Sequence, residues 1–153
     1  MKILHTVEFY HPSIGGAQEV VRQISERLVK MGHDVTIATT KIPRKSLIYN
    51  GVKIKEFDIS GNYVKGYIGN TTDYLNFVLN SVYDIIMNYA AQQWATDLLL
   101  PLLKKIRAKK ILVPCGYSGL KSHDYVQYYE NLKKWLHDYD ATIYHSNEYQ
   151  DII

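Results

Sequence analysis

The stretch HPSIGGAQEVV, residues 11–21, joins a predicted strand to a predicted helix, and its pattern decides the fold class. Two adjacent glycines, Gly15 and Gly16, stand at the junction. Glycine serves where a chain turns sharply, and also where another group must approach the backbone with no Cβ in its way. The sequence leaves two explanations open: a tight turn, or a loop that binds a diphosphate or another substrate at a helix N-terminus.

The residues after the glycines predict an amphipathic helix over 16–31. Its apolar positions recur every three or four residues, with one adjacent pair: Ala17, Val20, Val21, Ile24, Leu28 and Met31. This spacing places them on one face of a helix, and Gly32 follows as a stop signal.

Short runs rich in β-branched and aromatic residues predict strands over 2–7, 33–39, 52–59, 83–89, 109–115 and 141–146. Further helices are predicted over 72–81, opened by Thr71, Thr72 or Asp73, over 95–107, where Pro101 marks a kink or a start, and over 124–137. The segment 60–72, with three glycines, indicates an exposed loop. This alternation predicts an α/β fold, a Rossmann-like doubly wound parallel sheet with helices on both faces. A ligand is expected at the carboxyl ends of the strands, beside the first strand.

Composition narrows the functional classes. The chain has 153 residues, the length of one domain, and a net charge of +3 with scattered Lys and Arg, so nucleic acid is not an expected partner. The single cysteine, Cys115, favours a reducing compartment. His, Asp and Glu do not cluster at ligand spacing, and we expect no metal.

Known glycine loops fit poorly. A dinucleotide-binding loop needs G-x-G-x-x-G and an acid near the end of the second strand, where the sequence reads ATTK. That mismatch also weighs against an NAD- or S-adenosylmethionine-dependent enzyme. A P-loop motif is absent. A receiver domain would use Asp58 but lacks the paired acids and the lysine that should accompany it.

The longer stretch HPSIGGAQEVVRQISERLVKMGHDVTIAT, residues 11–39, resembles the amino-terminal segment of family-4 (GT4) glycosyltransferases, retaining enzymes of the GT-B fold. The resemblance rests on the glycine pair, the amphipathic helix and the turn Gly32-His33-Asp34-Val35 into the next strand. Later strands are placed as in the first domain of that family. The last of them ends at Ser146.

The resemblance implies transfer of a sugar from a nucleotide-diphosphate donor to a glycan or glycolipid acceptor, with retention and without metal or cofactor. Gly15 and Gly16 would lie against the donor diphosphate. Loop or strand-end positions make six residues candidates for acceptor binding: His11, Ser13, Asn88, Tyr89, Tyr63 and Tyr67. The resemblance also implies a role in polysaccharide biosynthesis. We therefore expect a cytoplasmic protein, with peripheral contact at the inner face of the membrane.

The sequence departs from the family after the fifth strand, where many members carry a histidine. Here that place reads Cys115-Gly116-Tyr117-Ser118. The catalytic group therefore stays open, with Tyr117, Ser118 and His123 as weak candidates. Cys115 is expected to be a small apolar residue at a strand end, because a nucleophile would need a base that the sequence does not place.

Residues 1–153 are thus expected to form the amino-terminal, acceptor-side domain of a hexosyltransferase-type enzyme. The chain stops about two turns into a predicted helix, so we expect it to be one piece of a longer protein. The donor-binding domain, with its E-x7-E motif, would be its partner, and the isolated domain would be inactive. The alternative is a non-catalytic Rossmann-like module that binds a nucleotide or a protein.

Overall fold

The computed structural model describes residues 1–148, and the predicted terminal helix lies almost entirely outside them. The helices (α), 3-10 helices (η) and strands (β) follow in this order: β1 (Lys2–Thr6), α1 (Gly16–Lys30), β2 (Asp34–Thr40), β3 (Ile48–Tyr49), β4 (Val52–Phe57), β5 (Ile59–Asn62), β6 (Gly66–Gly69), α2 (Thr71–Asn80), β7 (Ile85–Tyr89), α3 (Trp94–Asp97), η1 (Leu100–Lys105), β8 (Lys109–Val113), η2 (His123–Tyr125), α4 (Val126–Trp135), η3 (Leu136–Asp138) and β9 (Ala141–Thr142).

Within residues 1–148 the main sheet has seven strands in the order β3-β4-β2-β1-β7-β8-β9. Every neighbouring pair is parallel except β3 with β4. The chain builds outward from β1 to β2 and β4, then crosses to β7 on the other side of β1. This confirms the predicted α/β sheet, and the strand order is Rossmann-like. The reversal falls between β1 and β7, where open α/β sheets bind ligands at the carboxyl ends of their strands.

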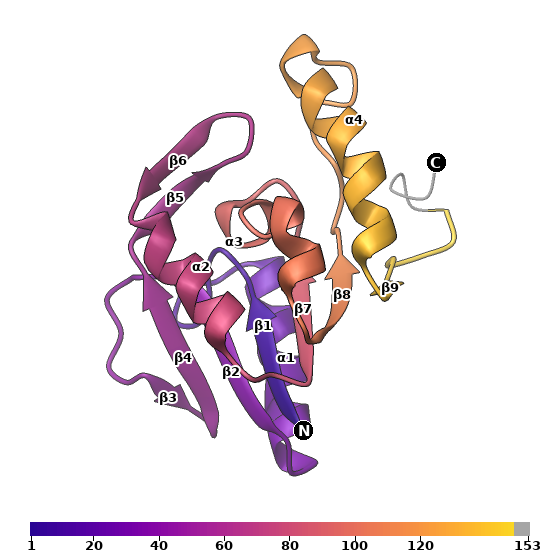
Figure 1. The fold of residues 1–153 in the computed structure, drawn as a ribbon. Helices are drawn as coiled ribbons and strands as arrows, with labels where there is room; N and C mark the ends of the chain where they lie inside the picture. Colours follow the sequence, from indigo (N-terminus) through magenta and orange to yellow (C-terminus); the bar gives the residue numbers. More distant parts are fainter. Residues whose placement is uncertain (149–153) are drawn as a thin grey trace.

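Alternation along the strands creates two cores, one on each face of the sheet. Ile3 belongs to a cluster that contains Val21 of α1, whereas Leu4 belongs to one formed with α2, α3, η1 and α4. Figure 1 shows α1 behind the sheet and α2 and α3 in front of it. Helices therefore cover both faces, as predicted.

Helix α1 confirms the prediction for 16–31 within one residue, and Gly32 follows it in the left-handed region with φ 86°. Its buried face differs in detail. Met31 is exposed, whereas the polar Ser25 is fully buried. Its Oγ has a hydrogen-bond partner there, since it lies 2.8 Å from Nδ1 of His5 in β1. Burial lowers the pKa of His5 to about 4, so its ring is neutral at pH 7.

The segment 52–72 corrects two predictions. The expected strand 52–59 ends at Phe57, and Ile59 starts a hairpin, β5–β6, where an exposed loop was predicted. The side-chain oxygen of Asn62 closes the hairpin turn by accepting the N–H groups of Val64, at 3.0 Å, and Lys65, at 2.8 Å. Sequence patterns missed this hairpin because glycines, rather than alternating β-branched residues, allow its strands to approach.

The predicted helix 95–107 is wrong as a continuous element. It is divided into α3 and the 3-10 helix η1, with Pro101 in the first turn of η1. Proline lacks the N–H that a continuing α-helix would need. Helix α2 agrees with prediction, but its cap is Asn70, whose side chain accepts the N–H groups of Thr72 and Asp73.

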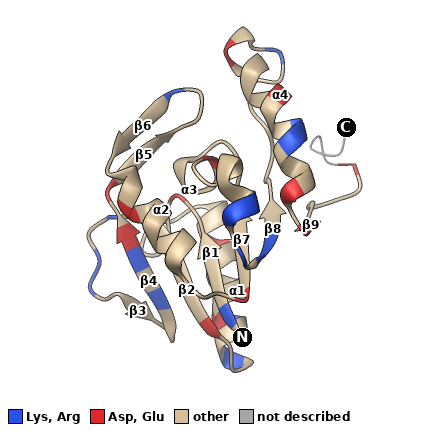
Figure 2. Ribbon diagram, in the orientation of Figure 1, with Lys and Arg blue, Asp and Glu red and all other residues tan. Residues whose placement is uncertain are grey.

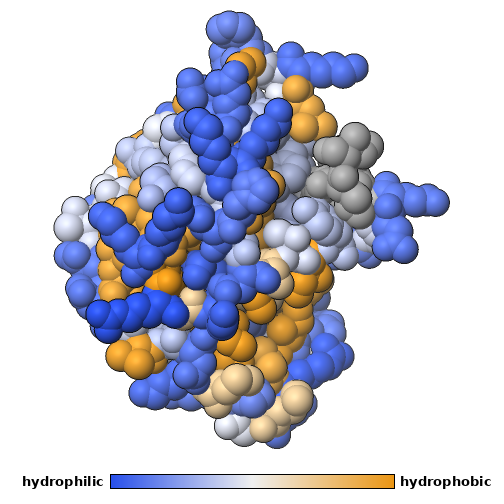
Figure 3. All heavy atoms as spheres, turned by 45° about the vertical axis from the view of Figure 1, so that its right-hand side comes forward, coloured by the Kyte–Doolittle hydropathy of each residue, from blue (hydrophilic) through white to orange (hydrophobic). Residues whose placement is uncertain are grey.

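Strands β1, β4, β7 and β8 are one or two residues shorter than predicted, and β9 contributes two residues of the expected six. The helix predicted over 124–137 is present as η2, α4 and η3 in succession. No helix among residues 1–148 has the length and apolarity needed to cross a bilayer. On the face drawn in Figure 3, hydrophobic residues lie in patches among hydrophilic ones.

Candidate functional site

A small hollow lies at the N-terminus of α1, beside the end of β1. Its volume is about 70 Å³. Residues of the β1–α1 loop and the first two turns of α1 line it: His11, Ser13, Ile14, Gly15, Gln18, Glu19 and Arg22. The fold thus brings together three of the predicted site residues, His11, Ser13 and Gly15, at the predicted edge of the sheet.

The two glycines adopt conformations open to other residues. Gly15 is extended, with φ 177° and ψ 166°, and Gly16 is the first residue of α1. A Cβ on Gly16 would meet no described atom within 4 Å, and one on Gly15 would meet the mobile end of the Gln18 side chain, with Oε1 at 2.4 Å. The backbone gives neither glycine a conformational reason to be there.

The first turn of α1 has no side-chain cap. The first hydrogen bond of the helix runs from the N–H of Glu19 to the carbonyl of Gly15, at 3.0 Å. Within residues 1–148, the N–H groups of Gly16, Ala17 and Gln18 have no protein acceptor. Such groups, at the positive end of a helix dipole, attract anions.

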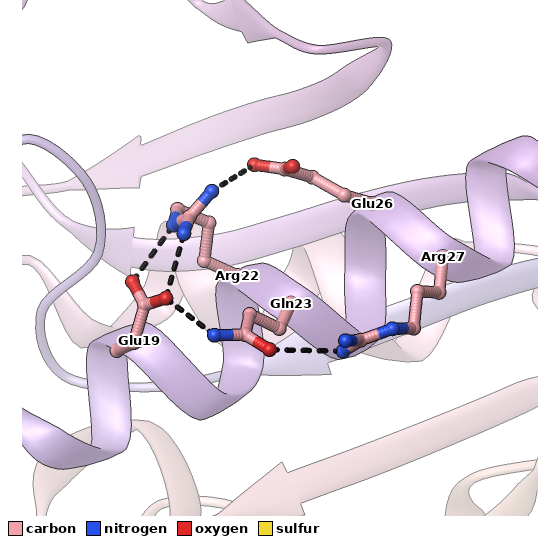
Figure 4. Close-up of polar contacts among 5 residues, drawn as sticks. All are labelled: Glu19, Arg22, Gln23, Glu26 and Arg27. Atoms are coloured by element: carbon pink, nitrogen blue, oxygen red, sulfur yellow. Dashed lines mark hydrogen bonds and ion pairs between the residues drawn. The ribbon is translucent and has the colours of Figure 1, made fainter.

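Glu19 brings a negative charge to the same hollow, and Arg22 balances it (Figure 4). The guanidinium donates from Nε to Glu19 Oε2 at 2.8 Å and from Nη2 to Oε1 at 2.6 Å, while Nη1 donates to Glu26. Hydrogen bonds from Arg22 and then Gln23 lower the pKa of Glu19 to about 2. The charge of the Glu19 carboxylate is therefore already balanced by Arg22 when an anion enters the hollow.

Arg44 anchors the β1–α1 loop from the segment after β2. Its side chain is only 4% exposed and donates to Glu56 Oε1 at 2.6 Å, to the carbonyl of His11 at 2.6 Å and to that of Thr40 at 3.2 Å. This buried contact links the loop to β2 and β4. Tyr10, in the same loop, is fully buried, and its hydroxyl has no partner among the described residues.

Asn88 and Tyr89 end β7 at the predicted ligand edge, but both are buried. The Asn88 amide donates to Thr6 Oγ1 and accepts from the Tyr139 hydroxyl, each at 2.7 Å. This placement gives both residues a structural role in the core and no surface on which an acceptor would rest.

The connection after β8 contacts the connection after β7. The Ser118 N–H donates to Gln92 Oε1 at 2.6 Å, and Gln92 Nε2 donates to the Ser118 carbonyl at 2.8 Å. Tyr117 is half-buried, with its ring centroid 6.1 Å from that of Tyr129. His123 is exposed in η2.

Cys115 lies at the end of β8 in the left-handed region, with φ 60°, as do Ala90 and Gln92 after β7. Non-glycine residues in this region store strain and concentrate at functional sites. The Cys115 Sγ is 3.4 Å from Nε2 of His145, a residue that sequence reasoning missed because 30 positions separate the two. The structure thus brings the imidazole of His145 next to the segment after β8, which has no histidine of its own between Cys115 and Ser118.

Tyr63 and Tyr67 lie in the hairpin that rises beyond the carboxyl ends of the strands (Figure 1). Tyr63 packs against α4. Its hydroxyl accepts a hydrogen bond from the Asn131 side chain at 3.1 Å, and its ring centroid lies 5.5 Å from that of Trp135. Its N–H donates to Asp97 Oδ2 at 3.0 Å. Burial raises the pKa of Asp97 to about 6. Tyr67 is half-buried, and burial raises its pKa too.

Among residues 1–148, no group of three or more His, Cys, Asp or Glu side chains is arranged to hold a metal ion. A scan against models of known protein families finds no match, and a search of curated proteins finds no significant similarity.

Proposed function

We propose that this chain is the amino-terminal, acceptor-side domain of a retaining GT-B glycosyltransferase of family 4. The N-terminus of α1 would bind the diphosphate of its nucleotide-sugar donor. The observation that carries the proposal is the glycine pair. Neither glycine has a conformation that requires glycine, and Gly16 is exposed beside three N–H groups without acceptors. An approaching anion explains both features.

In the proposed reaction, the bond between the sugar and the donor diphosphate breaks, and negative charge grows on the leaving group. The N–H groups of Gly16 and Ala17 and the dipole of α1 would stabilise that charge. Arg22 would contribute a cation by shifting part of its hydrogen bonding from Glu19 to the phosphate.

His145 is the proposed counterpart of the histidine that many family members carry after the fifth strand. Its Nε2 lies 3.4 Å from Cys115 Sγ, and Cys115 is the second residue after the end of β8. The imidazole would come from the segment after β9 rather than from the loop itself. A His145→Asn variant should then lose transfer activity while keeping donor binding.

The partner domain would close over the β1–α1 loop. Ile14, between Ser13 and Gly15, has 99% of its surface exposed, which suits a side chain that a second domain covers. The proposal includes a cytoplasmic protein with peripheral membrane contact and no resident cofactor.

A binding panel tests the proposed function. Nucleoside diphosphates and their sugars should displace pyrophosphate from the chain, and NAD and S-adenosylmethionine should not. If NAD bound more tightly than every nucleoside diphosphate, the proposal would be overturned. The alternative, a non-catalytic module, predicts that the wild type binds a nucleotide but transfers no sugar after the partner domain is supplied.

A further inference from the structure

A second and larger hollow also has His11 in its lining. This groove has a volume of about 650 Å³, within the range of small-molecule sites. It is lined by His11 and Pro12 of the β1–α1 loop, by Pro43, Arg44, Lys45 and Ser46 of the segment after β2, and by Tyr49 of β3. Because His11 lines both hollows, a ligand in the groove would lie next to an anion at α1.

Flat apolar surfaces dominate the groove. The rings of His11 and Tyr49 stack with their centroids 3.8 Å apart and their planes 21° apart. Two prolines, Pro12 and Pro43, extend this surface. The C–H face of a sugar ring is itself flat and apolar, so it can pack against such a stack and release water from both surfaces.

The groove is held in shape before any ligand enters. Three hydrogen bonds fix the Arg44 guanidinium against Glu56, His11 and Thr40. They join the two segments that form the groove walls. A preformed groove saves the ordering cost that binding would otherwise incur.

The rim of the groove is positively charged. Glu56 balances Arg44, but Lys45 in the lining is exposed and has no ion-pair partner in the described part of the chain. Figure 2 shows blue segments along the connection between β2 and β3. Lys45 lines the groove itself, so an anionic group on a bound ring would have a cation within the site.

We propose that this groove binds the acceptor end of an acidic glycan: a sugar ring that carries a carboxylate or a phosphate. The ring packs on the stack of His11 and Tyr49, and the anionic group lies beside Lys45. This assignment rests on the proposed function, because it places the acceptor next to the donor diphosphate. It adds the chemical class of the acceptor, which the resemblance leaves open.

The test follows amide signals of the chain by NMR during titration with glucuronate, glucose 6-phosphate and neutral glucose. Both acidic sugars should shift signals around His11 and Tyr49 and bind more tightly than glucose. Lys45→Gln should weaken the acidic sugars about three- to fivefold and leave glucose unchanged. The matched control, Lys105→Gln in η1, should change neither. Tyr49→Ala should weaken all three sugars.

Other occupants give different results. Equal binding of glucose and glucuronate, or no effect of Lys45→Gln, would overturn the acidic class. Tighter binding of uridine monophosphate than of either acidic sugar would make the groove a nucleotide site. Lys45-dependent binding to phosphatidylglycerol vesicles, without sugar binding, would make it a lipid-headgroup contact. A parallel titration with pyrophosphate, read at Gly16 and Ala17, separates the two proposals: its failure counts against the donor site and leaves the groove result standing.

Discussion

Two glycine-containing segments of this domain use glycine for different reasons. In the β5–β6 hairpin, Gly69 has φ 102°, and a Cβ there would lie 1.9 Å from the carbonyl oxygen of Asp58. At the start of α1, Gly16 is helical, and a Cβ would meet no described atom within 4 Å. The hairpin glycine is required by the protein's own backbone. Gly16 in the helix is not required by the protein's own backbone. We therefore explain its presence by the anion proposed to bind beside it.

The largest expected effect is at the hairpin. Gly69→Ala should lower the free energy of unfolding by more than about 3 kcal/mol, because strain in the left-handed region adds to a backbone clash. Urea denaturation of the chain measures it. Gly66→Ala is the matched control: its φ is 83° but its Cβ site is open, so about 1 kcal/mol is expected. Equal losses at both positions would contradict the steric argument.

A second comparison sets Arg44, which anchors the β1–α1 loop, against Arg22, which pairs with Glu19 and Glu26 on α1. Arg44→Ala should cost about 3 kcal/mol, because it removes the cation that pairs with Glu56 and the buried donor of the His11 carbonyl, and leaves Glu56 with the N–H of Ile42. Arg22→Ala, on the surface of α1, should leave stability close to that of the wild type. Chemical denaturation of both variants checks the order, and a larger loss at Arg22 would contradict it.

Two buried titratable groups should give stability opposite pH dependences. The pKa of His5 is lowered from 6.5 to about 4, so acidification protonates the unfolded chain first and removes stability as pH falls from 6.5 to 4. The pKa of Asp97 is raised from 3.8 to about 6, so the native state holds its proton longer and its contribution is lost as pH rises from 4 to 6.

Variants separate the two contributions. Between pH 7 and pH 4.5, His5→Gln should lose about 2 kcal/mol less stability than the wild type, and Asp97→Asn about 2 kcal/mol more. Unfolding by urea at the two pH values gives the differences. If the stability of the two variants depended on pH in the same way, burial would not set the pKa values of His5 and Asp97 as described.

The smallest expected effect is at the helix glycine. Gly16→Ala should leave the free energy of unfolding unchanged or raise it by up to about 1 kcal/mol, since alanine favours helix and the site is open. A loss above about 1 kcal/mol would mean that Gly16 serves the fold after all, as Gly69 does.

Local patterns were enough to predict much of the fold. The apolar spacing in residues 16–31 defines α1, and the alternation of strands and helices gives the parallel sheet. What they missed depends on contacts between distant residues. Gly61, Gly66 and Gly69 indicate a loop in the sequence, because their place in a hairpin is visible only once β5 and β6 face each other. Pro101 predicts a kink or a start and does stand in the first turn of η1, but the division into a short α-helix and a 3-10 helix does not follow from the pattern.

For the candidate site, sequence indicates the place in the fold but leaves out residues that shape it. The glycine loop at the end of the first strand follows from sequence, together with His11 and Ser13. Arg44, which anchors this loop from 33 residues away, gave no local signal. His145 was missed for the same reason. Asn88 was chosen for its place at a strand end, but the sequence does not show that Thr6 and Tyr139 occupy its amide.

The most direct test of the central claim is a titration of the chain with pyrophosphate, followed by NMR at the backbone N–H groups of the first turn of α1. The account predicts shifts concentrated at Gly16, Ala17 and Gln18 in the wild type. It also predicts their loss in a folded Gly16→Leu variant, but not in Lys134→Leu on α4. If Gly16→Leu bound pyrophosphate as the wild type does, or if no shift occurred by about 10 mM, the N-terminus of α1 would not be an anion site.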